Sequence, residues 1–303
     1  MKILITGGTG FVGTTLTREL TAKGHSVTIL MRKVEMGKAL PAGAVALEGD
    51  PTVRGAWQEQ VPEHEAFINL AGSSIFTRWT EEAKRAIRES RLLTTKHLVE
   101  ALASRRGKET HLFSTSAVGY YGFHADEKLI EESPPGTDFL ATLAREWEAE
   151  AVKVKEHGAR VVLCRFGIVM GRNGGMLGEI VPVFRMFLGA NLGSGDQWLS
   201  WIHEKDLARI FLYLLDNRAL EGPINCTAPE PVRNRDLTET LGRVLRVPTF
   251  LPPVPGFILR MMKGEFGSVI LKGQRVLPQR LLSAGFQFQY PTLEEALTEI
   301  LRK

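Results

Sequence analysis

A glycine-rich turn near the amino terminus constrains the fold of this 303-residue chain more than any other feature. Gly7, Gly10 and Gly13 follow an apolar run and precede an amphipathic one. The first glycine permits a tight turn, the second lets backbone approach a pyrophosphate, and the third lets a helix pack on its strand. A turn that binds nothing is the alternative, but the strand before and the helix after favour a dinucleotide site. The turn residues predicted to bind the cofactor are Thr6, Gly7, Gly10, Phe11, Val12 and Gly13.

Short apolar runs alternate with longer amphipathic segments along the first half of the chain. Strands are expected at Lys2–Thr6, Ser26–Met31, Ala44–Leu47, Ala66–Leu70, His111–Ser114 and Arg160–Ile168. Helices are expected at Phe11–Lys23, from about Thr80 to Ser104, and at 138–157. This alternation is typical of right-handed βαβ units. We therefore predict an α/β fold, a doubly wound parallel-sheet Rossmann fold.

The texture of the sequence changes beyond Gly171, where Gly and Pro become frequent and the helical segments shorten. We predict that residues 1–170 form a Rossmann domain that binds NADP, with part of its sheet completed by 197–228. Residues 171–303 should then form a smaller carboxy-terminal α/β region on the substrate side, which ends in the amphipathic stretch Leu293–Leu301.

The end of the second predicted strand indicates which dinucleotide is bound. An NAD site usually has an acid there, which holds the ribose hydroxyls. Arg32 and Lys33 occupy this position instead. An acid would repel a 2′-phosphate, whereas a guanidinium can bind it through two hydrogen bonds. A surface arginine with no ligand is the alternative, but the two cations together favour NADP(H) over NAD.

Later segments fit the same cofactor path. Asp50 follows the third predicted strand, where it could lie near the adenine amino group. Leu70, Ala71 and Gly72 follow the fourth strand, where small residues let backbone pass beside the cofactor. Arg165, in the sixth predicted strand, could reach either cofactor or substrate. Asp and Gly also simply make turns, so each signal is weak by itself.

Four segments, TGGTGFVG (6–13), GD (49–50), NLAG (69–72) and STSAVGYYG (114–122), resemble the extended short-chain dehydrogenase/reductase family in order and spacing. That family includes NAD(P)-dependent sugar-nucleotide epimerases and dehydratases. Longer runs at 75–95, 199–210, 224–234 and 273–288 resemble one subgroup, named nucleoside-diphosphate-sugar epimerases, with a small carboxy-terminal domain of unknown function. The resemblance covers essentially the whole chain.

The chemistry of that family depends on Ser or Thr together with Tyr and Lys, which lie four residues apart on one helix face. Ser116 matches the Ser position, but Leu140 stands at the Tyr position and Ala144 at the Lys position. An aliphatic side chain cannot transfer a proton. The catalytic candidates are therefore Ser116 with Tyr120 or Tyr121, although a packing or gating role for the tyrosines is the alternative.

Four residues are candidates for substrate binding. Arg78 and Trp79 follow the fourth predicted strand, where an arginine beside an aromatic ring suits an anionic or ring-bearing substrate. Trp201 and His203 belong to a second aromatic group, before a predicted helix. Packing of Trp79 beneath its helix and a structural role for His203 are the alternatives.

Composition excludes several classes of function. The chain has 38 Lys and Arg against 34 Asp and Glu, a mild excess that predicts no nucleic-acid partner. Cys164 and Cys226 give no disulfide framework or metal spacing, and the opening MKILITGG leaves no room for a cleavable leader, so a cytoplasmic protein with no metal and no membrane partner is expected. No nucleophile elbow or phosphate-loop lysine is present.

Two hypotheses of different class follow. The first is an NADP(H)-dependent oxidoreductase or epimerase-like enzyme, a monomer or homodimer, with a non-standard proton donor and a polar carbonyl or nucleotide-sugar substrate. The second is a protein that binds NADP(H) without turnover, as a sensor or interaction partner.

Overall fold

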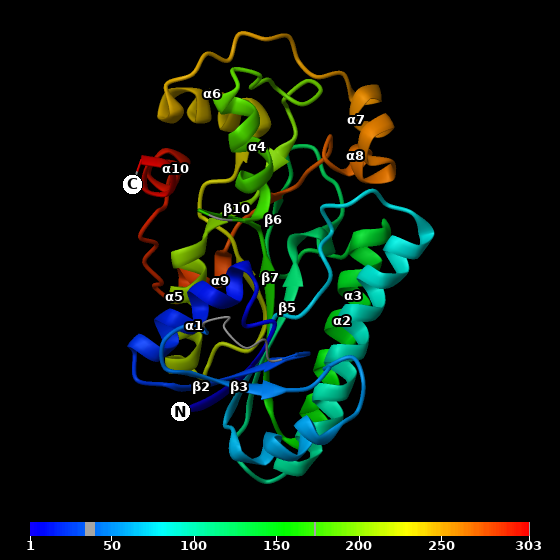
Figure 1. The fold of residues 1–303 in the computed structure, drawn as a ribbon, viewed down its shortest axis with the longest axis vertical. Helices are drawn as coiled ribbons and strands as arrows, with labels where there is room; N and C mark the ends of the chain where they lie inside the picture. The colour runs from blue at the N-terminus through cyan, green and yellow to red at the C-terminus, as the bar shows by residue number, and fades with distance from the viewer. Residues whose placement is uncertain (34–39, 173, 303) are drawn as a thin grey trace.

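A parallel sheet of seven strands crosses the molecule (Figure 1). The computed structural model describes residues 1–33, 40–172 and 174–302. The strand order is β11-β7-β5-β4-β1-β2-β3. The strands are β1 (Lys2–Thr6), β2 (Ser26–Met31), β3 (Ala44–Glu48), β4 (Ala66–Asn69), β5 (His111–Ala117), β7 (Arg160–Phe166) and β11 (Gly222–Cys226). This sheet confirms the predicted Rossmann fold.

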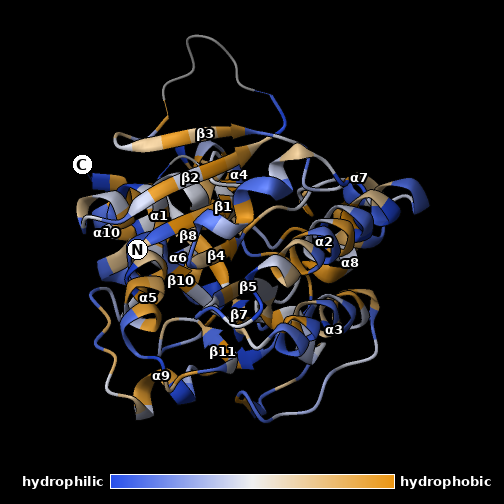
Figure 2. Cartoon of the chain, turned by 90° about the horizontal axis from the view of Figure 1, so that it is seen from below, coloured by the Kyte–Doolittle hydropathy of each residue, from blue (hydrophilic) through white to orange (hydrophobic). Residues whose placement is uncertain are grey.

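Helices cover both faces of the sheet, as the end-on view of Figure 2 shows. On one face lie α1 (Phe11–Ala22) and α5 (Glu204–Asp216), which pack on each other. On the other lie α2 (Glu81–Leu102) and α3 (Phe139–Val152). The side chains of β1 alternate accordingly: Ile3 and Ile5 join the core beneath α1, and Leu4 joins the core beneath α2.

The expected strand at Arg160–Ile168 is two strands, because the chain leaves the sheet at Gly167. A Cβ atom on Gly167 would lie 2.7 Å from the carbonyl oxygen of Ser200, so only glycine fits this crossing. The chain continues as β8 (Ile168–Gly171), which pairs with β10 (Trp201–His203) outside the main sheet. Similarly, the expected helix 138–157 ends as α3 at Val152 and continues as the 3-10 turn η4 (Lys153–His157).

Shorter elements complete the fold. Helices α4 (Gly175–Arg185), α6 (Asn234–Leu245), α7 (Gly256–Lys263) and α8 (Glu265–Val269) gather at the upper end of Figure 1. The strands β9 (Trp198–Leu199) and β12 (Val232–Arg233) pair with each other, as do β6 (Lys128–Leu129) and β13 (Arg275–Val276). The remaining elements are α9 (Gln279–Ser283), α10 (Leu293–Arg302), η1 (Ala56–Glu63), η2 (Ala103–Arg105) and η3 (Val118–Tyr121).

A buried carboxylate ties the last segment of the chain to the sheet domain. Asp206, at the start of α5, has no exposed surface and accepts hydrogen bonds from the backbone N–H groups of Gln289 and Tyr290, both at 2.8 Å. In the described part of the chain no helix is long and apolar enough to cross a bilayer. The division into domains at residue 170 stays a prediction.

Candidate functional site

The glycine-rich turn between β1 and α1 is built so that side chains cannot enter it. Gly7 has a φ of +71°, and a Cβ atom on it would lie 2.9 Å from the backbone nitrogen of Ala71. A Cβ atom on Gly13 would lie 2.3 Å from the carbonyl oxygen of Gly7. The turn itself is closed by a hydrogen bond of 3.0 Å from the Gly10 N–H to that same oxygen. Gly7 and Gly13 therefore set the shape of the turn.

The amino terminus of α1 has the properties of an anion site. No side chain caps this end, and the first turn contains no acidic residue. Its first N–H groups lack intrahelical acceptors, and the helix dipole adds positive potential there. Gly174 lies against the ring of Phe11, since a Cβ atom at Gly174 would lie 2.7 Å from that ring. A dinucleotide pyrophosphate fits these features.

A chain of buried hydrogen bonds joins the glycine turn to both helices of the opposite face. Thr6 Oγ1 donates to Asn69 Oδ1 at 2.7 Å, and Asn69 Nδ2 donates to Thr95 Oγ1 at 2.8 Å. Trp147 Nε1 also donates to Thr95 Oγ1, at 2.8 Å. The Ala71 N–H donates to Thr6 Oγ1 at 3.3 Å, which holds residues 70–72 beside Gly7. The sequence predicted the loop but not this network, whose members are widely separated in the chain.

The predicted adenine-side residues lie where the second and third strands end. Arg32 and Lys33 are exposed directly after β2. Asp50 follows β3, and its Oδ1 accepts hydrogen bonds from the N–H and the hydroxyl of Thr52, at 2.8 and 2.7 Å. This bonding makes Asp50 part of a turn. Its contact with adenine stays a prediction, and so do the contacts of Arg32 and Lys33 with a 2′-phosphate.

At the end of β5 lies a buried ion pair. Ser116 Oγ donates to Glu148 Oε1 at 2.6 Å, and Arg165 holds the same carboxylate through Nε and Nη2, both at 2.8 Å. All three side chains are almost completely buried. Arg165 Nη1 donates to the Tyr121 hydroxyl at 2.9 Å and to the Glu131 carbonyl oxygen at 3.1 Å. Internal acceptors thus hold the Arg165 guanidinium, and its contact with a cofactor stays a prediction.

The two tyrosines after Ser116 have different surroundings. Tyr121 has no exposed surface, and its hydroxyl donates to Asn225 Oδ1 at 2.7 Å while it accepts from Arg165. Burial raises the pKa of Tyr121 to about 12. The hydroxyl hydrogen of Tyr121 is therefore engaged inside the core, and its catalytic role stays a prediction. Tyr120 is half-buried, with the Arg165 guanidinium 3.5 Å from its ring centroid, and its hydroxyl has no hydrogen-bond partner among the described residues.

The two positions that the sequence analysis aligned with the family's Tyr and Lys carry apolar side chains in the structure. Leu140, in the first turn of α3, lies against Gly119, where a Cβ atom would be 3.2 Å from the Leu140 Cβ. Ala144 lies one turn later and is 4% exposed. No side chain at either position can carry a proton.

Three of the four predicted substrate residues are buried. Trp201 has no exposed surface, and its Nε1 donates to the Glu230 carbonyl oxygen at 2.9 Å. His203 is equally buried: its Nε2 lies 3.2 Å from Glu299 Oε2, and its Nδ1 accepts from the Lys205 N–H at 3.0 Å.

Trp79 is 6% exposed and packs against Phe139 and Phe266. Trp79 and Trp201 thus pack in the core and His203 caps α5, and their direct substrate contacts stay predictions. Arg78 is exposed and stays a candidate.

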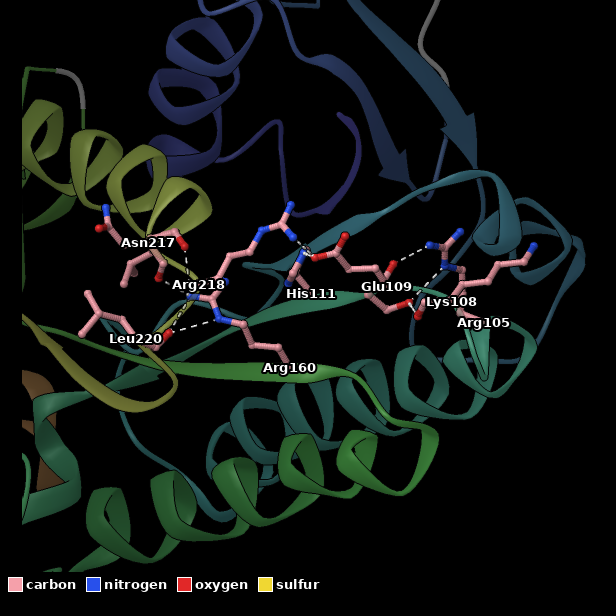
Figure 3. Close-up of polar contacts among 10 residues, drawn as sticks. Arg105, Lys108, Glu109, His111, Arg160, Asn217, Arg218 and Leu220 are labelled. Carbon is pink, nitrogen blue, oxygen red and sulfur yellow. Dashed lines mark hydrogen bonds and ion pairs between the residues drawn. The ribbon is translucent and has the colours of Figure 1, made fainter.

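A second group of charged residues lies at the opposite end of the strands. Figure 3 shows Arg160 directed at the end of α5, where its Nη2 donates to the carbonyl oxygens of Leu214 and Asn217 at 2.9 and 3.1 Å and also bonds that of Leu220. Arg218 pairs with Glu109 nearby. Ligands of open α/β sheets bind at the carboxyl ends of the strands, so this cluster is structural.

Comparisons of the sequence and of the structure with known proteins point to the same family. The model of the NAD dependent epimerase/dehydratase family matches residues 3–226, and a domain of unknown function, DUF1731, matches residues 254–300. The chain is 40% identical to the chloroplastic epimerase family protein SDR39U1 homolog of Arabidopsis thaliana, over 100% of this chain and 87% of the relative. It is 38% identical to the epimerase family protein YfhF of Bacillus subtilis, over 99% of this chain and 98% of the relative. A crystal structure of human epimerase family protein SDR39U1 with NADPH superimposes with a TM-score of 0.87, at 33% identity and full coverage of both chains.

Proposed function

The chain belongs to the NAD dependent epimerase/dehydratase family, and on this premise we propose that it binds NADP(H) and acts as an oxidoreductase or epimerase-like enzyme. The observation that carries the proposal is the amino terminus of α1, which has neither a side-chain cap nor an acid in its first turn. Three glycines hold the backbone where a pyrophosphate would bind. The cofactor, when bound, supplies hydride transfer.

The preference for NADP(H) rests on the exposed Arg32 and Lys33. The related human protein was crystallised with NADPH, which supports the same choice. The substrate proposed is a small polar carbonyl or alcohol compound, for which a nucleotide-linked sugar is one class. The exposed guanidinium of Arg78 would pair with an anionic group of such a substrate.

For the proton step, the candidates are Ser116 and Tyr120. Ser116 Oγ donates its proton to Glu148, so its lone pairs are left to accept a hydrogen bond from a substrate hydroxyl. Tyr120 retains a hydroxyl that no described residue binds, and its ring is held by Arg165. Tyr120 would therefore move the proton at its Oη, with Ser116 orienting the substrate oxygen.

The proposal is tested in two steps with the intact protein. Calorimetric titration should show NADPH binding, with weaker binding of NADH. NADPH should then be oxidised in the presence of one of a set of sugar nucleotides, ketones and aldehydes. The loss of NADPH absorbance measures this oxidation. Absence of NADPH binding would contradict the proposal as a whole.

A second candidate function is favoured by one specific observation, the apolar side chains of Leu140 and Ala144 at the relay positions. It is a protein that binds NADP(H) tightly and does not turn it over. Tight NADPH binding, with no oxidation of NADPH by any substrate of the set, would favour this candidate over the enzyme.

A further inference from the structure

Helix α2 carries an arginine that lies directly behind the loop after β4. Arg91 Nη1 donates to the carbonyl oxygens of Ser73 and Ile87, both at 3.0 Å. A Cβ atom on Gly72 would lie 3.1 Å from the Arg91 Cζ. The guanidinium also lies over the Trp147 ring of α3, 5.3 Å from its centroid. Arg91 therefore occupies the junction of α2, α3 and residues 72–73.

The charge of Arg91 is not neutralised within the described residues, where no carboxylate forms an ion pair with it. Its neighbour one turn earlier, Arg88, pairs instead with Glu146 at 2.8 Å. Burial lowers the pKa of Arg91 to about 10, so the side chain is still protonated at neutral pH. A partly buried cation without a counter-ion is costly, and a bound anion would remove that cost.

The sheet order indicates which part of a dinucleotide would lie near Arg91. The order places β4, β5 and β7 on one side of β1, and β2 and β3 on the other. In a Rossmann fold a dinucleotide lies across this reversal, with one mononucleotide half over each set of strands. The predicted 2′-phosphate site at Arg32 follows β2, which assigns the adenine half to β2 and β3. Arg91 contacts the β4 loop and α3, on the side of the nicotinamide half.

We propose that Arg91 binds the nicotinamide half of the dinucleotide and supplies, from α2, the positive charge that position 144 of α3 lacks. Trp147, beneath the guanidinium, stands one turn after Ala144 on the same helix. Arg91 Nη1 is engaged by backbone, which fixes the side chain, while Nε and Nη2 have no acceptor among the described residues. These two N–H groups would donate to phosphate or ribose oxygens of that half. The inference rests on the proposed binding of NADP(H).

The test compares two ligands by calorimetry: NADPH, and 2′,5′-ADP, which lacks the nicotinamide half. Arg91→Met should weaken NADPH binding by about tenfold or more, the effect of losing charge-assisted hydrogen bonds, and leave the affinity for 2′,5′-ADP unchanged. Arg91→Lys should recover part of the loss because it restores the charge. The matched control is Arg88→Met, which removes an exposed, paired arginine from the same helix and should change neither affinity.

Three results would overturn the inference. Unchanged NADPH affinity in Arg91→Met would show that the guanidinium does not contact the cofactor. Equal weakening of both ligands would show that Arg91 only positions residues 72–73. Failure of the wild-type protein to bind NADPH would remove the proposed function, and this inference with it. Should Arg91→Met fail to fold, the ratio of the two affinities in Arg91→Lys and Arg91→Gln decides in the same way.

Discussion

At the scale of single residues, the proposed preference for NADP(H) rests on Arg32. It is exposed directly after β2, beside Lys33. Arg32→Asp should reverse the preference from NADPH to NADH, because a carboxylate repels a 2′-phosphate and accepts hydrogen bonds from ribose hydroxyls. Calorimetry with both cofactors measures the change. Lys108→Asp, the same charge change at the opposite end of the strands, should leave the preference unaltered, and equal affinities of wild type for the two cofactors would contradict the argument.

Gly13 tests the shape of the turn. Gly13→Ala would place a Cβ atom 2.3 Å from the Gly7 carbonyl oxygen, so the turn must open. We expect NADPH affinity to fall at least about tenfold and the melting temperature to drop, because the added methyl group overpacks the turn. Gly178 of α4 has nothing within 4 Å of such a Cβ. Gly178→Ala should therefore preserve affinity and raise stability by roughly 0.5–1 kcal/mol, as for an exposed helical glycine. Equal behaviour of the two variants would contradict the prediction.

The role of a residue could be predicted from the sequence where neighbouring residues determine it. It could not be predicted where residues distant in the chain determine it. Gly7 and Gly13 restrict each other across one turn, so their spacing in the sequence carries the information. The ring nitrogens of Trp201 and His203 contact groups far along the chain: the Glu230 carbonyl oxygen for Trp201, and the Glu299 carboxylate for His203. A sequence gives the chemistry of an indole or an imidazole but not whether its nitrogen faces a ligand or a backbone carbonyl.

At the scale of elements, the end of α5 depends on Arg160. Its guanidinium binds the last carbonyl oxygens of that helix (Figure 3). The same group lies 5.4 Å from the Phe113 ring centroid. Arg160→Met should lower the free energy of unfolding by about 2–3 kcal/mol, because it leaves several carbonyls without a charged donor. Denaturant unfolding measures this loss. NADPH affinity should stay unchanged, since the cluster lies at the amino ends of the strands.

The control for Arg160 is its neighbour Arg218. Arg218 forms an ion pair with Glu109, and both side chains are more than half exposed. Arg218→Met should cost less than about 1 kcal/mol, because exposed ion pairs are screened by water. If Arg218→Met lowered the free energy of unfolding as much as Arg160→Met does, the effect of Arg160 could not be due to its burial and its bonds to carbonyl oxygens.

Long periodic elements were predicted well, and short ones were not. The strands from β1 to β5 and helices α1 and α2 lie within a few residues of their expected bounds, because hydrophobic spacing over a whole element is a strong signal. Helices α7, α8 and α9 have eight, five and five residues, too few for a period to register. The break at Gly167 also has no local signal, since its cause is the Ser200 carbonyl.

At the scale of the whole molecule, stability should fall in mild acid. His64, His111 and His203 are each at most 6% exposed, and burial lowers the pKa of each below the usual value of 6.5. Below about pH 6.5 the unfolded chain binds protons that the folded protein does not, so stability rises with pH across this window and is lost as pH falls. The melting temperature should thus decrease from about pH 7.5 to about pH 5.5.

Two variants check the origin of that dependence. His64→Gln combined with His111→Gln should make the decrease shallower. Glu131 acts in the opposite direction, because burial raises the pKa of its carboxyl. Glu131→Gln should therefore make the decrease steeper. A melting temperature that is constant or higher at the acid end would contradict the assignment.

The position of β11 in the sheet has a consequence for how the chain folds during synthesis. β11 (Gly222–Cys226) is the edge strand beside β7 (Arg160–Phe166), yet β8, α4, β9, β10 and α5 separate the two in the chain. During synthesis, the outer edge of β7 stays unpaired until Gly222–Cys226 has left the ribosome. An open edge of the apolar residues Val161–Leu163 would be exposed to aggregation over that interval. A nascent chain that stops after α5 should therefore engage chaperones, and one extended past β11 should be released.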